Sequence, residues 1–89
     1  MILVEELLEG KRLKGVKINI NSEEERKEIC FEIVQDKEFT LDLKLPEWGK
    51  NFETHFNGEL LVNLSRDGVV SFDKVWKRGD MLKLIIKMW

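Results

Sequence analysis

Residues 39–45 read FTLDLKL, and apolar side chains alternate with polar ones along the whole stretch. A period of two is typical of a β-strand with one buried face and one face in water. The alternation ends directly before Pro46, the lone proline of the chain. Because proline has no backbone N–H to donate to a sheet, it favours the end of the strand at this point. One face of the predicted strand carries Phe39, Leu41, Leu43 and Leu45, and the other carries Thr40, Asp42 and Lys44.

The same period recurs on both sides of this stretch. Turn sequences rich in Gly and Asp separate several of the segments, as at Asp67-Gly68 and 77–80. Strands at this spacing predict an all-β fold, an antiparallel β-sandwich of about seven strands, in a single domain over residues 1–89. The further predicted strands are residues 2–8, 16–20 (VKINI), 29–34 (ICFEIV), 59–64 (ELLVNL), 69–76 (VVSFDKVW) and 81–89 (MLKLIIKMW).

Two of these segments leave an alternative open. Residues 2–8 are interpreted as a strand, although the acidic stretch within them would also tolerate a helical turn. Ser22 and Glu25 form a capping-box pattern, so a helix over 23–35 competes with the strand at 29–34. The strand is preferred because β-branched and aromatic residues cluster there and a polar turn follows.

Composition excludes several classes of protein. The chain has 89 residues, a net charge of −2 and 43% hydrophobic side chains, which suits one small globular domain. One cysteine (Cys30) and one histidine (His55) exclude an internal disulfide and a zinc site built from Cys and His alone. We expect no membrane partner, because no apolar run reaches the length of a membrane span and no signal-peptide pattern opens the chain. The compartment stays open, with the cytoplasm as the default.

Charged runs are interpreted as solvated surface. A basic segment (Lys11, Arg12, Lys14 and Lys17) lacks the interleaved aromatic residues of a nucleic-acid site, so we expect no nucleic-acid partner. The contiguous acidic residues Glu23–Glu25 do not resemble two carboxyl groups placed across a cleft.

Four short motifs follow one another in the second half of the chain. They are Leu-Pro-Glu-Trp at 45–48, Asn-Gly-Glu at 57–59, Asp-Gly at 67–68 and Trp-Lys-Arg-Gly-Asp at 76–80. Their order and spacing over residues 39–88 resemble the β-sandwich portion of bacterial β-L-arabinofuranosidase-type glycoside hydrolases. The chain departs from the family pattern at Val69, where the family has an aromatic residue, and at Lys87, where it has proline. The matching positions are Pro46, Trp48, Asn57, Gly58, Gly68, Trp76, Gly79, Asp80 and Met88.

The resemblance implies an accessory role. In that family a separate helical barrel carries a catalytic Glu and a cysteine-rich zinc site, and this chain has neither the barrel nor more than one cysteine. We therefore expect no catalytic residue, no metal and no cofactor, and a non-catalytic module that packs against a partner domain or against itself. A patch including Ile85, Met88 and Trp89 is the predicted contact for a homodimer or a partner protein.

Three tryptophans are the candidate contact residues: Trp48, Trp76 and Trp89. An exposed indole stacks on the apolar face of a sugar ring, and the alternative function is therefore a carbohydrate-binding module with a glycan ligand. The competing interpretation is that Trp48 and Trp76 fill the ends of the sandwich, since an indole buries a large apolar area.

Overall fold

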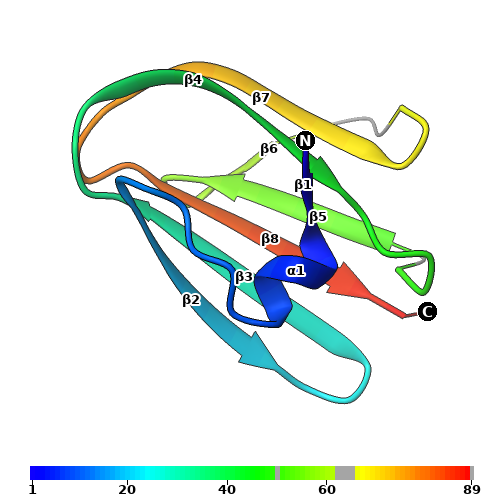
Figure 1. Cartoon of the computed structure of the whole chain (residues 1–89). Helices are drawn as coiled ribbons and strands as arrows, with labels where there is room; N and C mark the ends of the chain where they lie inside the picture. The colour runs from blue at the N-terminus through cyan, green and yellow to red at the C-terminus, as the bar shows by residue number, and fades with distance from the viewer. Residues whose placement is uncertain (50, 62–65, 89) are drawn as a thin grey trace.

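The computed structural model describes residues 1–49, 51–61 and 66–88, and it consists of two facing β-sheets (Figure 1). The predicted all-β sandwich is confirmed, with eight strands among the described residues. The three-stranded sheet has the order β1 (Ile2–Leu3), β4 (Lys37–Lys44), β7 (Val69–Trp76). The five-stranded sheet has the order β2 (Val16–Ser22), β3 (Arg26–Ile33), β8 (Met81–Lys87), β5 (Asn51–Phe56), β6 (Glu59–Leu61).

Strand pairing is antiparallel with one exception. The alternating stretch at residues 39–45 lies almost entirely in β4, which pairs with β7 from Lys37 opposite Trp76 to Lys44 opposite Val69. The strand ends two residues before Pro46, as its missing N–H predicts. The exception is β1, a two-residue strand that runs parallel to β4.

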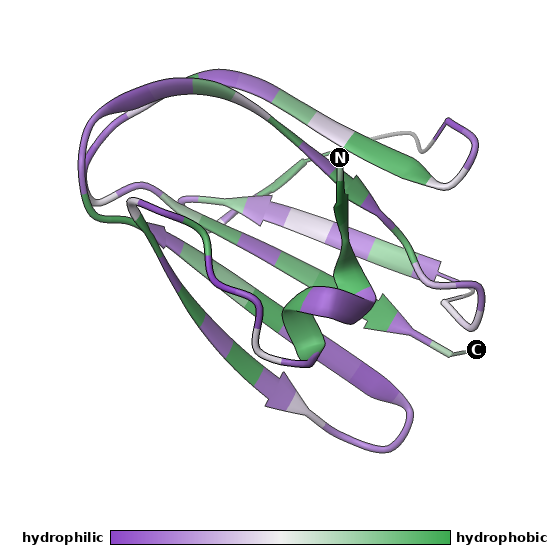
Figure 2. Cartoon of the chain, in the orientation of Figure 1, coloured by the Kyte–Doolittle hydropathy of each residue, from purple (hydrophilic) through white to green (hydrophobic). Residues whose placement is uncertain are grey.

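The alternating apolar positions meet between the two sheets. Green and purple bands alternate along the strands of both sheets in Figure 2, as a half-buried strand requires. The inward side chains of both sheets are buried. They include Ile29, Phe31 and Ile33 of β3, Leu82, Leu84 and Ile86 of β8, Leu41 and Leu43 of β4, and Val70 and Phe72 of β7.

The first segment corrects the sequence prediction. A strand over residues 2–8 is wrong beyond Leu3, because Val4–Leu8 form the helix α1. Val4 and Leu7, three residues apart, lie on one side of the helical turn, and both are fully buried. Burying these two side chains together needs the helical spacing, since a strand would turn them to opposite faces. Within the described ranges, no helix has the length and apolar character needed to cross a membrane.

Three further segments were tested by the structure: the competing helix over 23–35, the residues 51–56 and the predicted strand at 59–64. The competing helix over 23–35 is excluded, because Arg26–Ile33 form β3. β5, over Asn51–Phe56, was not predicted as a strand. The strand predicted at 59–64 is present as β6 over Glu59–Leu61, and its residues 62–64 lie outside the described residues.

Candidate functional site

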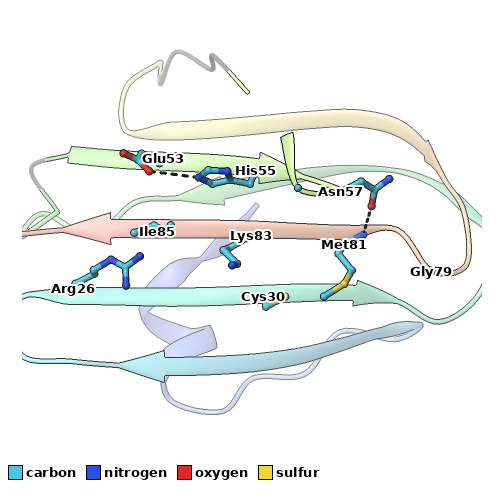
Figure 3. A pocket seen from close by; sticks show the side chains of 10 residues that line it. Arg26, Cys30, Glu53, His55, Asn57, Gly79, Met81, Lys83 and Ile85 are labelled. Carbon is cyan, nitrogen blue, oxygen red and sulfur yellow. Dashed lines mark hydrogen bonds and ion pairs between the residues drawn. The ribbon is translucent and has the colours of Figure 1, made fainter. Parts of the chain in front are cut away.

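The outer face of the five-stranded sheet carries a shallow groove of about 780 Å³ (Figure 3). Three adjacent strands, β3, β8 and β5, build it with the side chains that alternate away from the core. Met81, Ile85 and Cys30 are its apolar side chains, two glycines lie at one end, and the other side chains are polar or charged. The lining residues are Arg26, Cys30, Glu53, His55, Asn57, Gly58, Gly79, Met81, Lys83 and Ile85.

Opposite charges neutralise one another across this face. Glu53 lies between two partners, with its carboxylate 3.3 Å from Nζ of Lys87 and 3.5 Å from Nε2 of His55. The hydrogen bond from Lys87, with a smaller contribution from His55, holds the pKa of Glu53 below its ordinary value. On the other side of the groove, Glu28 forms ion pairs with Arg26 at 3.3 Å and with Lys83 at 3.2 Å.

Cys30 lies in the middle of this face but is a poor nucleophile. Burial raises the pKa of its thiol above the ordinary value of 9.0, and the neighbouring Lys83 ammonium only partly opposes that effect. The thiolate is the reactive form, so the side chain stays protonated and unreactive near neutral pH. Among the described residues there is also no group of three or more His, Cys, Asp or Glu that could hold a metal ion.

Trp76, the first of the candidate contact residues, is fully buried at one end of the sandwich. Its ring stacks on Phe39 with centroids 5.2 Å apart and meets the edge of Phe56 at 6.0 Å. The indole N–H donates to the backbone carbonyl of Phe39 at 2.9 Å. This indole has no face left for a sugar ring.

The other tryptophans do not form a platform with it. Trp48 is half-buried against the core and lies beyond the opposite end of β4 from Trp76. It lines a hollow of about 450 Å³ together with Leu3, Glu5, Lys44, Leu45, Pro46 and Glu47. Trp89 lies outside the described residues.

The predicted partner patch is only partly accessible. Ile85 is 6% exposed on the floor of the groove, and Met88 is half-buried. The groove itself was not predicted, although the sequence contains all of its residues. Ile85 faces Glu28 on one side and Glu53 on the other, and only the strand register brings these residues together.

The fold and this face define a class of protein: a small β-sandwich module with ion pairs on the outer face of its five-stranded sheet. The family model described as "Beta-L-arabinofuranosidase, GH127 middle domain" matches residues 10–88. The chain therefore belongs to the GH127 middle-domain family, and it is an accessory module related to carbohydrate-active enzymes.

Two solved structures share the fold. The first is a GH127 beta-L-arabinofuranosidase from Geobacillus stearothermophilus T6, 26% identical, with a TM-score of 0.56 over 85% of this chain and 13% of that chain. The second, described as a glycoside hydrolase, is 18% identical with a TM-score of 0.59 over 81% of this chain and 13% of that chain. No curated protein matches the chain. The chain thus spans 13% of the length of either solved relative.

Proposed function

We propose that this chain is a non-catalytic accessory module of a β-L-arabinofuranosidase-type enzyme, and that it acts by packing against a partner domain or against itself. The observation that carries the proposal is the match of the middle-domain family to residues 10–88. The Geobacillus enzyme devotes only 13% of its chain to the corresponding module.

The chemistry of the described surface supports the same proposal. General acid–base or nucleophilic catalysis needs titratable groups whose pKa values suit the reaction and whose positions converge on a substrate. Here the pKa of Glu53 is lowered and that of Cys30 is raised, so one stays an anion and the other a neutral thiol near pH 7. Both shifts move these groups away from the working range of an acid–base catalyst.

A chimera tests the packing role. The segment of the Geobacillus enzyme that corresponds to this chain is deleted in one variant and replaced by this chain in another. We expect the deletion to lower the melting temperature and the arabinofuranosidase activity of that enzyme, and the replacement to restore both in part. The isolated chain should release no arabinose from an aryl β-L-arabinofuranoside. Activity of the isolated chain, or a deletion variant as stable and active as the parent, would contradict the proposal.

A second candidate function is supported by the hollow beside Trp48. A half-buried indole flanked by Glu5, Glu47 and Lys44 combines one stacking surface with hydrogen-bonding groups, as a sugar-binding subsite does. The groove on the five-stranded sheet offers no such surface, since none of its lining side chains is a tryptophan, tyrosine or phenylalanine.

Tryptophan fluorescence distinguishes the two functions. The chain is titrated with arabinan- and xylan-type oligosaccharides, with iodide quenching as a measure of indole accessibility. A saturable change that disappears in Trp48→Phe would establish a carbohydrate-binding module. An unchanged spectrum with every sugar would leave packing as the function.

A further inference from the structure

β2 is an edge strand with an open side. It pairs with β3, and within the described ranges it has no second partner strand. Only its first residue is covered on the open side, where an isolated bridge joins Val16 to Leu13 and the Val16 N–H donates to the Leu13 carbonyl at 3.3 Å. The Val34 N–H donates to the backbone carbonyl of Gly15 at 3.1 Å, and the Glu23 N–H donates to the backbone carbonyl of Arg26 at 2.9 Å. Backbone bonds alternate along an antiparallel pair, so the odd-numbered residues of β2 face β3. The backbone N–H and C=O groups of Ile18 and Ile20 therefore point away from β3, toward the open edge of the sheet.

The inner face of β2 is only partly covered. The second sheet has five strands and the first has three, so β2 extends beyond the strands that face it. Leu7 of α1 and Leu13 line a hollow of about 470 Å³ with the apolar side chains of β2. Ile18 remains half-buried, and Ile20 is 39% exposed.

The edge of β2 has few of the features that prevent edge-to-edge pairing. Edge strands are commonly protected by lysines, proline, bulges or very short length. β2 is seven residues long, contains no proline and carries one charged residue, Lys17. Its register with β3 runs without a break from Val16 to Ser22, so there is no bulge.

The charges at the two ends of β2 are opposite. The basic segment (Lys11, Arg12, Lys14 and Lys17) lies at its start, and an acidic turn (Glu23–Glu25) follows its end. All of these side chains are exposed. Lys11 pairs with Glu6 at 3.3 Å, but within the described part of the chain the others form no ion pair. In an antiparallel pair of β2 strands, the start of one lies beside the end of the other, so β2 is complementary to its own copy.

We propose that two copies of the chain associate through the open edges of their β2 strands, antiparallel, with the two-fold axis at Asn19. This register overlaps residues 17–21 of both strands, and it leaves the Val16 N–H bonded to Leu13. It places Ile18 opposite Ile20 of the second copy. The free backbone N–H and C=O groups of these residues can then bond across the pair, and their partly covered side chains come into contact on the same face. It also places the acidic turn of each copy beside the basic segment of the other. The proposal names the surface for the packing role proposed above and rests on it.

Light scattering with a charge variant tests the association. The chain has a mass of 10.6 kDa, and we expect twice that mass at high protein concentration, falling back toward the single mass on dilution or added salt. Asn19→Lys sets two like charges opposite each other at the two-fold axis, which destabilises the pair. Asn19 is exposed, so the fold should survive and the variant should stay monomeric. Ser71→Lys, with the same charge change on an exposed position of β7, should still dimerise.

Cysteine cross-linking tests the register. In a Cys30→Ser background, Asn19→Cys should form a disulfide-linked dimer on mild oxidation, because residues opposite each other at the axis have Cβ atoms about 5 Å apart. Asn21→Cys is the control. In this register position 21 of one copy lies four residues along the strand from position 21 of the other, so the two introduced cysteines are about 13 Å apart. Equal cross-linking at both positions would overturn the register. A monomeric chain at every concentration would overturn the pairing, and if the chimera is then still restored, the packing role stands without it.

Discussion

Trp76 shows how a single residue ties the two sheets together. It belongs to β7 of the three-stranded sheet, stacks on Phe39 of the neighbouring strand and reaches Phe56 of the opposite sheet. Its N–H occupies the carbonyl of Phe39. The same residue type at Trp48 is only half-buried, so residue type alone does not determine the role.

Replacing Trp76 by Phe should therefore destabilise the chain strongly. We expect a loss of about 2–4 kcal/mol in the free energy of unfolding, from the smaller ring and from the lost hydrogen bond of the indole N–H. Urea denaturation followed by circular dichroism measures this loss. The matched variant Trp48→Phe should lose less, because its ring is half-buried. Equal losses at both positions would mean that Trp76 has no special structural role.

The Cys30 thiol provides a pH-dependent readout at the residue scale. Because burial raises its pKa, alkylation by iodoacetamide should accelerate with a midpoint above pH 9.0 in the folded chain. Unfolding in urea should move that midpoint down. The folded pKa exceeds the unfolded value, so the stabilising contribution of the neutral thiol is present below the unfolded pKa and is lost as pH rises through the folded one.

Lys83→Gln is the matched variant for this measurement. The Lys83 ammonium lowers the pKa of Cys30, so its removal should raise the midpoint further and slow alkylation at a fixed pH. A lower midpoint in this variant would show that the charge of Lys83 does not lower the pKa of the Cys30 thiol.

At the scale of elements, the turn between β5 and β6 also positions a third strand. Asn57 and Gly58 have φ angles of 50° and 87°, as a two-residue hairpin turn with two left-handed positions requires. The side-chain carbonyl of Asn57 accepts from the backbone N–H of Met81 at 2.8 Å, and its amide donates to Asp80 at 3.2 Å. The first residue of β8 is thereby attached to the hairpin.

Two substitutions at Asn57 separate its conformational and bonding roles. Asn57→Gly keeps the left-handed backbone and removes both side-chain bonds, so we expect a loss of about 1–2 kcal/mol. Asn57→Ala removes the same bonds and keeps a Cβ at positive φ without the polar group that lets Asn adopt this conformation, which should add about 1 kcal/mol. Thermal and urea unfolding of the two variants measure the difference. Identical losses would show that the backbone conformation at this position costs nothing.

The elements also show what the sequence could predict. β4 and β7 were predictable because nearly every inward position is apolar. β5 was missed because Thr54 occupies an inward position between Phe52 and Phe56 and breaks the apolar alternation. Thr54 is 1% exposed, and its hydroxyl donates to the carbonyl of Leu61 at 3.4 Å, so a polar residue is tolerated there only through tertiary contact.

The candidate site was less predictable than the fold for a related reason. Two of the ion pairs on this face join residues that are far apart in sequence, Glu28 with Lys83 and Glu53 with Lys87. These contacts follow from the β3–β8–β5 strand order, which no local pattern contains. The family motifs predicted the class of the domain without predicting this face.

At the scale of the whole molecule, the unequal size of the two sheets has two consequences. Five strands face three, and β2 therefore extends beyond the cover of the opposite sheet. α1 fills part of that space with Val4 and Leu7, which explains why a segment with strand-like composition becomes helical. The remainder of the uncovered area is the outer part of the inner face of β2, beside the open edge where we propose that a second copy binds.

The filling role of α1 gives the last prediction. Leu7→Ala should lower the free energy of unfolding by about 2–5 kcal/mol, because Leu7 is fully buried beside β2 and the small helix is held by tertiary packing alone. The variant should also bind more of a hydrophobic dye, since the space between α1 and β2 opens. Leu3→Ala is the matched control at a position 40% exposed, and it should lose much less stability. If both variants unfold at the same urea concentration as the parent chain, α1 does not seal the sandwich, and the inner face of β2 must be covered by another part of the assembly.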